Sequence, residues 1–93
     1  MYAVTVTLTI KEGQTDGFLP LMLQNARASR GSEPGCQQFD VCRDGDQVFL
    51  YELYDDRAAF DSHLASAHFQ QFDLAAANMV TDKEIRLFDE VLR

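Results

Sequence analysis

The stretch Val48–Tyr54, VFLYELY, most restricts what this chain can fold into. It is a short run of aromatic and branched residues, which is typical of a β-strand buried on both faces. Such a strand needs a sheet that is covered on both sides. One carboxylate, Glu52, stands inside the run, and Asp55 and Asp56 follow it, where they can end the strand and cap a helix.

The remaining segments supply three more strands. Tyr2–Ile10 alternates apolar residues with alanine and threonine, so one face of this strand is apolar and the other semi-polar. Cys36–Arg43 predicts a second strand, and the turn sequence Asp44–Asp46 predicts a tight hairpin that pairs it with Val48–Tyr54. Met79–Leu92 is interpreted mainly as a terminal strand.

Helical spacing marks the segments between these strands. Thr15 or Asp16 can cap the first helix, and Gly31 can end it. Ala58–Leu64 indicates a short amphipathic helix, and a second short helix follows it, with Ser66 as the candidate cap between the two.

The order strand, helix, strand, strand, helix, strand predicts an α+β, ferredoxin-like βαββαβ fold in a single domain over residues 1–93. In this fold an antiparallel sheet carries helices on one face, which leaves the other face bare. A chain of this length also buries only part of the surface of its unfolded state. We therefore expect face-to-face homodimerisation through the sheets.

Composition excludes some partners. The net charge is −7, from 15 acidic and 8 basic residues, and this charge disfavours nucleic acid and anionic membrane surfaces. The amino terminus has no basic lead or cleavage site, and no apolar run approaches the roughly 20 residues of a membrane helix. We expect a cytoplasmic protein.

The two cysteines do not predict a disulfide. Cys36 and Cys42 lie six positions apart in one predicted strand, which separates them by about 20 Å. We expect two reduced, buried thiols, as in a reducing compartment.

Four polar side chains are candidates for a common site: Asn25, Glu52, His63 and His68. The first helix, the third strand and the second helical unit should all meet on the helix-covered side of the sheet. Glu52 shares its side-chain direction with Val48, and His63 lies on the buried stripe of its helix. In one unbroken helix the two imidazoles would point about 140° apart, so they can share a ligand only if the helix breaks near Ser66.

Each candidate also has a structural interpretation. Glu52 can pair with an arginine such as Arg43 or Arg86, His63 can be a core histidine, and Asn25 can tie its helix to a strand. A zinc or iron site of His63, His68 and Glu52 is disfavoured, because helical zinc ligands are spaced i to i+4 and no cysteine lies nearby. We expect no bound metal.

Two strings carry a resemblance to a known family. "EPGCQQFDV" at Glu33–Val41 and "YELYDDRAAFDSHLASAHF" at Tyr51–Phe69, together with Asn25, resemble the antibiotic biosynthesis monooxygenase domain family. Within it they look most like the branch of quinol monooxygenases and of the enzyme that degrades phosphorylated autoinducer-2. The resemblance implies a dimeric α+β barrel, in which the carboxy-terminal strand is often exchanged. The chain has no tryptophan, which argues against the haem-degrading branch.

The resemblance implies an oxygenase that oxidises a quinol- or anthrone-like aromatic with O2 and needs no cofactor. Such chemistry requires a base, a donor for the developing oxyanion and a dry pocket. The residues expected to act are His63, His68, Asn25 and Glu52. The residues expected to line the pocket are Met22, Phe39, Tyr51, Phe60, Phe69 and Phe72.

The same residues would serve two other functions. A cofactor-free isomerase acting on a small carbonyl compound similar to autoinducer-2 needs the same base and donor. A non-enzymatic, dimeric ligand-binding module needs only the pocket. The sequence leaves these alternatives open.

Overall fold

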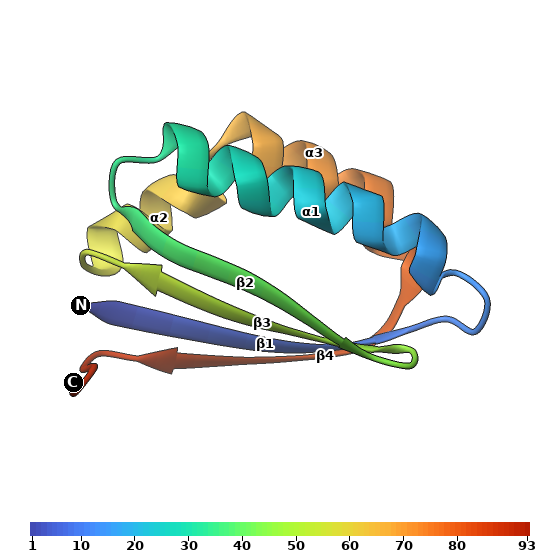
Figure 1. Ribbon diagram of the computed structural model, residues 1–93. Coiled ribbons are helices and arrows are strands. Elements are labelled where there is room, and N and C mark those ends of the chain that lie inside the picture. Colours follow the sequence, from blue (N-terminus) through green and yellow to red (C-terminus); the bar gives the residue numbers. More distant parts are fainter.

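The computed structural model describes residues 1–93, and its elements follow the predicted order (Figure 1). The elements are β1 (Tyr2–Ile10), α1 (Thr15–Ser32), β2 (Cys36–Asp44), β3 (Gln47–Tyr54), α2 (Arg57–Leu64), α3 (Ala67–Ala76), the 3-10 helix η1 (Ala77–Met79) and β4 (Val80–Phe88).

The four strands form one sheet in the order β2-β3-β1-β4, and every neighbouring pair is antiparallel. The helices α1, α2 and α3 lie together on one face of this sheet (Figure 1). This arrangement confirms the predicted α+β, ferredoxin-like βαββαβ fold. None of the helices combines the length and the apolar character that crossing a bilayer requires.

The hairpin between β2 and β3 forms as predicted. Asp44 pairs with Gln47, which leaves Gly45 and Asp46 as the two turn residues. Gly45 has a φ of 62°, a left-handed conformation that glycine adopts without a steric penalty.

The caps of the two short helices are also confirmed. The Asp56 side chain accepts a hydrogen bond from the backbone N–H of Ala59 at the start of α2. Ser66 accepts one from the N–H of Phe69 at the start of α3. The helical unit therefore breaks where the sequence offered a second cap.

The predicted ends of the first helix are wrong. Its N-cap is Gln14, with no side-chain cap, because Thr15 and Asp16 are already helical and use their side chains elsewhere. The Thr15 hydroxyl donates to Oδ1 of Asp46 at 2.8 Å, which ties α1 to the β2–β3 turn. Gly31 does not end the helix, which continues for one more residue.

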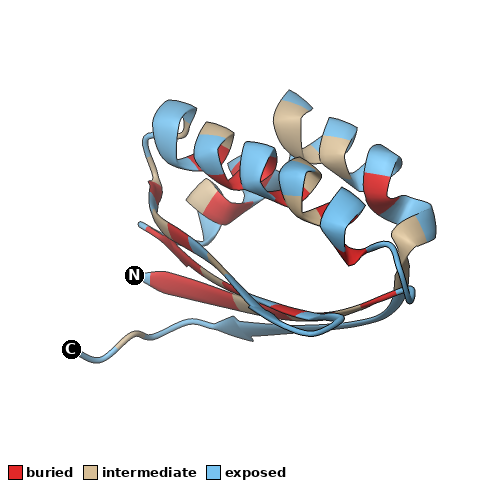
Figure 2. Cartoon of the chain, turned by 45° about the vertical axis from the view of Figure 1, so that its right-hand side comes forward, coloured by how far each residue is buried: buried red, intermediate tan, exposed pale blue.

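The core lies between the helices and the sheet. Figure 2 shows that buried residues concentrate on β1 and on the sheet-facing sides of the helices. Phe18 and Met22 of α1 are buried against Val4, Phe39 and other strand residues in one apolar cluster. This is the layer that the alternation in Tyr2–Ile10 predicted.

The opposite face of the sheet is only partly covered in one chain. Phe49 is 41% exposed on this face, and the neighbouring Cys42 is exposed as well. The prediction of two buried thiols is therefore wrong for Cys42 and confirmed for Cys36, whose thiol pKa burial raises to about 11. Cys42 is exposed because the helices cover only the other face.

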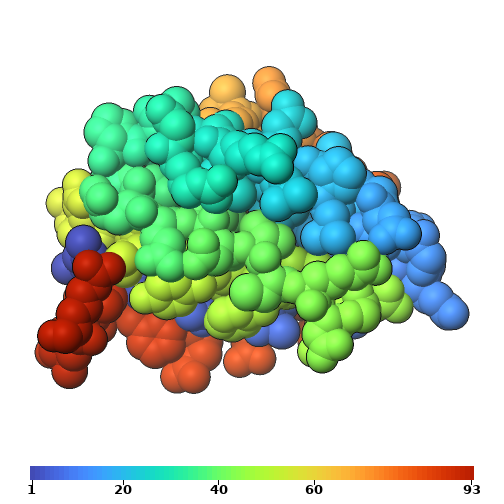
Figure 3. Space-filling view, viewed as in Figure 1, coloured from blue at the N-terminus to red at the C-terminus, as the bar shows by residue number.

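The edge strand β4 is exposed on both faces. Ile85 and Leu87 point to the helix side but remain 48% and 45% exposed, because no helix extends over them. Beyond β4 the last residues project at the edge of the molecule (Figure 3). The cavity described next opens along this uncovered strand.

Candidate functional site

An apolar cavity of about 110 Å³ lies between the helices and the sheet. Three of the four predicted site residues line it, namely Asn25, Glu52 and His63. Five of the six residues predicted to form the pocket line it too: Met22, Phe39, Phe60, Phe69 and Phe72. Its open side lies beside Leu64 and Ile85, which are 39% and 48% exposed.

Tyr51 is the residue of that list that the structure places elsewhere. It precedes Glu52 in β3, and successive side chains of a strand point to opposite faces. Tyr51 pairs with Thr5 and Asp40 on the face that the helices do not cover. The prediction that Tyr51 lines the pocket is therefore wrong. The alternation of side chains along β3 that places Glu52 in the cavity places Tyr51 on the other face.

His63 is held among aromatic rings near the end of α2. It follows Phe60 by three residues, which puts both on the sheet-facing stripe, and it is only 2% exposed. Its ring centroid lies 5.1 Å from that of Phe69 and 5.6 Å from that of Tyr54. Burial lowers the pKa of His63, so the neutral imidazole is favoured.

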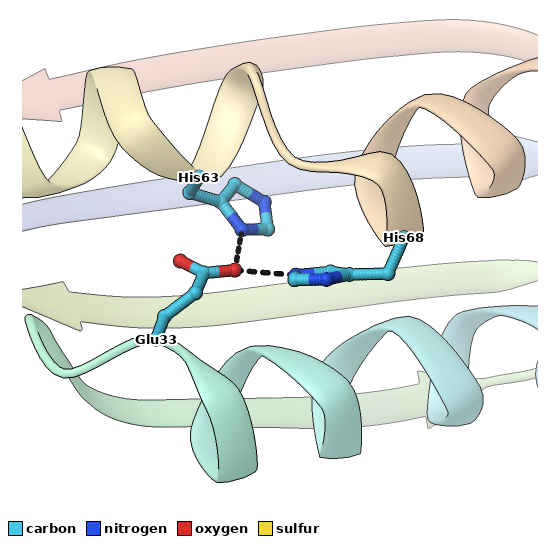
Figure 4. A group of neighbouring side chains, drawn as sticks. All are labelled: Glu33, His63 and His68. Atoms are coloured by element: carbon cyan, nitrogen blue, oxygen red, sulfur yellow. Dashed lines mark hydrogen bonds and ion pairs between the residues drawn. The ribbon is translucent and has the colours of Figure 1, made fainter.

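Two neighbours determine which nitrogen of His63 carries the proton. Nδ1 lies 2.8 Å from Oε2 of Glu33 and 3.3 Å from Oγ of Ser29. The Ser29 hydroxyl donates its own proton to the backbone carbonyl of Asn25 at 2.8 Å. Both Glu33 and Ser29 can therefore only accept a hydrogen from Nδ1. Nδ1–H therefore donates, and the lone pair of the neutral ring is on Nε2, which makes no hydrogen bond and points away from Glu33 (Figure 4).

His68 reaches the same carboxylate from the start of α3. The break at Ser66 brings the two imidazole centroids within 5.9 Å, as the sequence required for a shared ligand. Nε2 of His68 lies 2.5 Å from Oε2 of Glu33 (Figure 4). His68 does not line the apolar cavity but a separate groove between α1 and α3.

Glu33 is the site residue that sequence reasoning missed. It is the C-cap of α1, with its backbone N–H bonded to the backbone carbonyl of Ser29. Its side chain is only 12% exposed and lies between the two histidines, 30 and 35 positions away in the sequence. The only signal for it was its place at the start of the string Glu33–Val41.

Glu52 is buried in the cavity wall without an arginine partner. It shares its face with Leu50 and Tyr54, and the Tyr54 hydroxyl donates to its Oε1 at 2.6 Å. Burial raises the pKa of Glu52 to about 7, with the nearby Glu33 raising it further and the bond from Tyr54 opposing the change. Glu52 can therefore give or take a proton near neutral pH.

Asn25 is 3% exposed and lies between the cavity and the groove beside His68. Its Oδ1 has no hydrogen-bond partner, and its side chain makes no bond to a strand. The alternative of a tie between helix and strand is therefore excluded. A buried amide that lacks partners can bind a polar group of a ligand.

One group of side chains could hold a metal ion. The ligand atoms of Glu33, His63 and His68 lie within 4.8 Å of one another. The carboxylate that joins the two histidines is Glu33, whereas Glu52 accepts from Tyr54 and is not part of the group.

Three solved structures show how widely this fold recurs at low identity. A candidate antibiotic biosynthesis monooxygenase from Nitrosomonas europaea is 24% identical, with a TM-score of 0.92 over 99% of this chain and 100% of that one. Another antibiotic biosynthesis monooxygenase is 29% identical, with a TM-score of 0.89 over 99% and 100% of the two chains. A candidate member from Deinococcus radiodurans is 25% identical, with a TM-score of 0.90 over 100% of this chain and 95% of that one.

A sequence model of one family covers most of the chain. This is the model of the antibiotic biosynthesis monooxygenases, and it matches residues 1–73, which include Asn25, Glu33, Glu52 and both histidines. The match and the site geometry concern the same segments. The chain therefore belongs to the antibiotic biosynthesis monooxygenase family.

Proposed function

We propose that this protein is a cofactor-independent monooxygenase that oxidises a small, quinol- or anthrone-like aromatic with O2. The observation that carries this proposal is the state of His63. Its Nδ1–H is bonded to Glu33, and its unprotonated Nε2 belongs to a side chain in the wall of an apolar cavity. A neutral imidazole oriented by a carboxylate is a suitable general base.

The first step is proton transfer from the substrate to Nε2 of His63. The substrate O–H or activated C–H bond breaks, and an N–H bond forms on the imidazole. Glu33 lies 2.8 Å from Nδ1 and stabilises the resulting imidazolium. Glu33 is thus a positioning residue, and His68 acts through it by holding the same oxygen.

The substrate anion then supplies the electrons. The anion reduces O2, and one oxygen atom becomes bonded to a ring carbon of the substrate. The second oxygen atom leaves as water, with two protons that come from the carbon and hydroxyl groups of the substrate. The Asn25 amide can donate to the oxyanion. Glu52, with its pKa near 7, is the second group in the cavity wall that can transfer a proton to the departing oxygen.

Cavity size favours a single-ring substrate. The volume is about 110 Å³, which is less than the about 150 Å³ of an apolar cavity that holds benzene, so a single ring would fill the cavity and reach its open side. A wider, anthrone-like molecule would have to extend through the open side past Leu64 and Ile85.

We propose a homodimer that packs through the sheet faces, because the exposed Phe49 and its neighbours lie on a face that the helices do not cover.

The test is oxygen consumption with single-ring quinols and with anthrones. We expect uptake to fall by about 10²- to 10⁴-fold in His63→Ala, which removes the base. Ser62→Ala, one residue away on the exposed side of α2, is the matched control. Unchanged uptake in a folded His63→Ala protein would refute the assignment of the base, and no uptake by the wild type with either class would refute the oxygenase.

One observation favours a second candidate, a carbonyl isomerase. Isomerisation removes a proton from one carbon and delivers a proton to another, and the cavity offers two groups for this task, His63 and Glu52. Deuterium exchange at carbon in a small ketone, without oxygen uptake, would identify this reaction.

A further inference from the structure

We propose that Glu33, His63 and His68 form a binding site for a divalent transition-metal ion, and that the bound ion removes the base. The donor set of two imidazoles and one carboxylate is found in catalytic zinc sites and in non-haem iron sites. The second part of the proposal rests on the proposed function, whereas the site itself does not.

The three ligands converge from three separate segments. Glu33 comes from the end of α1, His63 from α2 and His68 from the first turn of α3 (Figure 4). Their side chains are only 12%, 3% and 21% exposed, so water competes weakly for the donor atoms. The helix break at Ser66 is what allows both rings to face one carboxylate.

An independent observation indicates a missing ligand at this point. Oε2 of Glu33 accepts from both rings, whereas Oε1 is buried and has no hydrogen-bond partner. A buried carboxylate oxygen without a partner is costly, and a cation that both oxygens of Glu33 bind would remove this cost.

The distances require only small movements. Two ligand atoms about 2.1 Å from one ion lie about 3.0 to 3.4 Å apart, depending on the coordination angle. The observed separations from Oε2 are 2.8 Å to His63 and 2.5 Å to His68, and all three donor atoms lie within 4.8 Å of one another, so moves of about 1 Å would admit an ion. Water or substrate would fill the remaining positions.

Metal binding and base action exclude each other at His63. In the metal-free protein Nδ1 carries the proton and Nε2 has the lone pair. A metal ion that binds Nδ1 needs a lone pair on that nitrogen. The proton therefore moves from Nδ1 to Nε2, and the ring remains neutral. His68 changes in the same way, from a proton on Nε2 to one on Nδ1. In the occupied protein His63 can therefore no longer act as the base in the cavity.

The first experiment measures Zn²⁺ binding to the full chain by isothermal titration calorimetry. We expect one ion per chain, with affinity at least about 100-fold weaker in Glu33→Gln and in His68→Ala. Glu33→Gln keeps an acceptor for Nδ1–H and should fold. Glu84→Gln, which removes an exposed carboxylate from β4, is the matched control and should bind as the wild type does. No saturable binding, or binding that both variants retain, would overturn the site.

The second experiment follows the imidazole nitrogens of His63 by ¹⁵N NMR, which needs no turnover. We expect Nε2 to change from unprotonated to protonated as diamagnetic Zn²⁺ is added, and not in His68→Ala. An unchanged Nε2 at full occupancy would overturn the loss of the base. If turnover is found, inhibition by Zn²⁺ should follow occupancy. Absence of turnover would count against the proposed function and leave both metal readouts intact.

Discussion

Replacing Glu52 with glutamine should make the protein more stable at alkaline pH. Glu52 is 4% exposed, and burial raises its pKa to about 7 from the ordinary value of 4.5. The replacement removes the charge and keeps the shape. The glutamine carbonyl can still accept the hydrogen bond that the Tyr54 hydroxyl donates at 2.6 Å.

The magnitude follows from proton linkage. Between pH 4.5 and 7 the unfolded chain has released the Glu52 proton and the folded chain still holds it. Stability therefore falls as pH rises through this window, by about 1.4 kcal/mol per pH unit and about 3 kcal/mol in all. Below pH 4.5 both states are protonated and the penalty is absent. Glu52→Gln should thus match the wild type in acid and exceed it by about 3 kcal/mol at pH 8.

The assay is urea unfolding of both proteins across this pH range at one protein concentration. The difference between them isolates Glu52, because other titrating groups contribute to both. Glu84→Gln on the exposed strand β4 controls for the loss of one negative charge. A difference that does not change with pH, or a variant less stable than the wild type at pH 8, would refute the desolvation of Glu52.

Two further predictions concern the fold and the assembly. Gly35→Ala should destabilise the protein by about 1 to 3 kcal/mol in thermal unfolding, because the added Cβ would lie 2.5 Å from Cβ of Ala59. Gly31→Ala is the control: its added Cβ would have nothing within 4 Å, so it should not destabilise the protein. Phe49→Lys should convert the proposed dimer to a folded monomer in light scattering, while Gln70→Lys on an exposed turn of α3 should not. A Phe49→Lys protein that remains dimeric would exclude this face as the interface.

The sequence predicted the fold because its signals are local. Alternation in Tyr2–Ile10, the glycine turn at Gly45 and the caps at Asp56 and Ser66 each depend on a few neighbouring residues, and all four are present in the structure. Glu33 could not be found in this way, because its partners are 30 and 35 positions away and the turn around it looks like any other turn.

The wrong assignments also have physical reasons. Side chains along β3 alternate between the two faces of the sheet, so the direction that places Glu52 in the cavity places Tyr51 on the opposite face. The aromatic character of Tyr51 was therefore not enough to predict its position. The expectation that Cys42 is buried rests on the usual behaviour of free cysteines, which act as small apolar residues, and not on a signal in its own strand. The helices of the chain cover only one face of the sheet, and Cys42 lies on the other face, where it is exposed.

Under the proposed function, the opposite pKa shifts in the cavity wall favour a substrate that arrives without a charge. Burial raises the pKa of Glu52 and lowers the pKa of His63, so it favours the uncharged form of both groups. A substrate that arrives as an anion would meet a desolvated wall, the Glu33 carboxylate nearby and a chain of net charge −7. A neutral quinol avoids these costs, because its anion and the imidazolium appear together. At about 4 Å and an effective dielectric of about 20, such a pair attracts by about 4 kcal/mol. That attraction exists only after the proton has moved, so it offsets the lowered pKa of His63 when the reaction requires it, and it gives no advantage to a preformed anion.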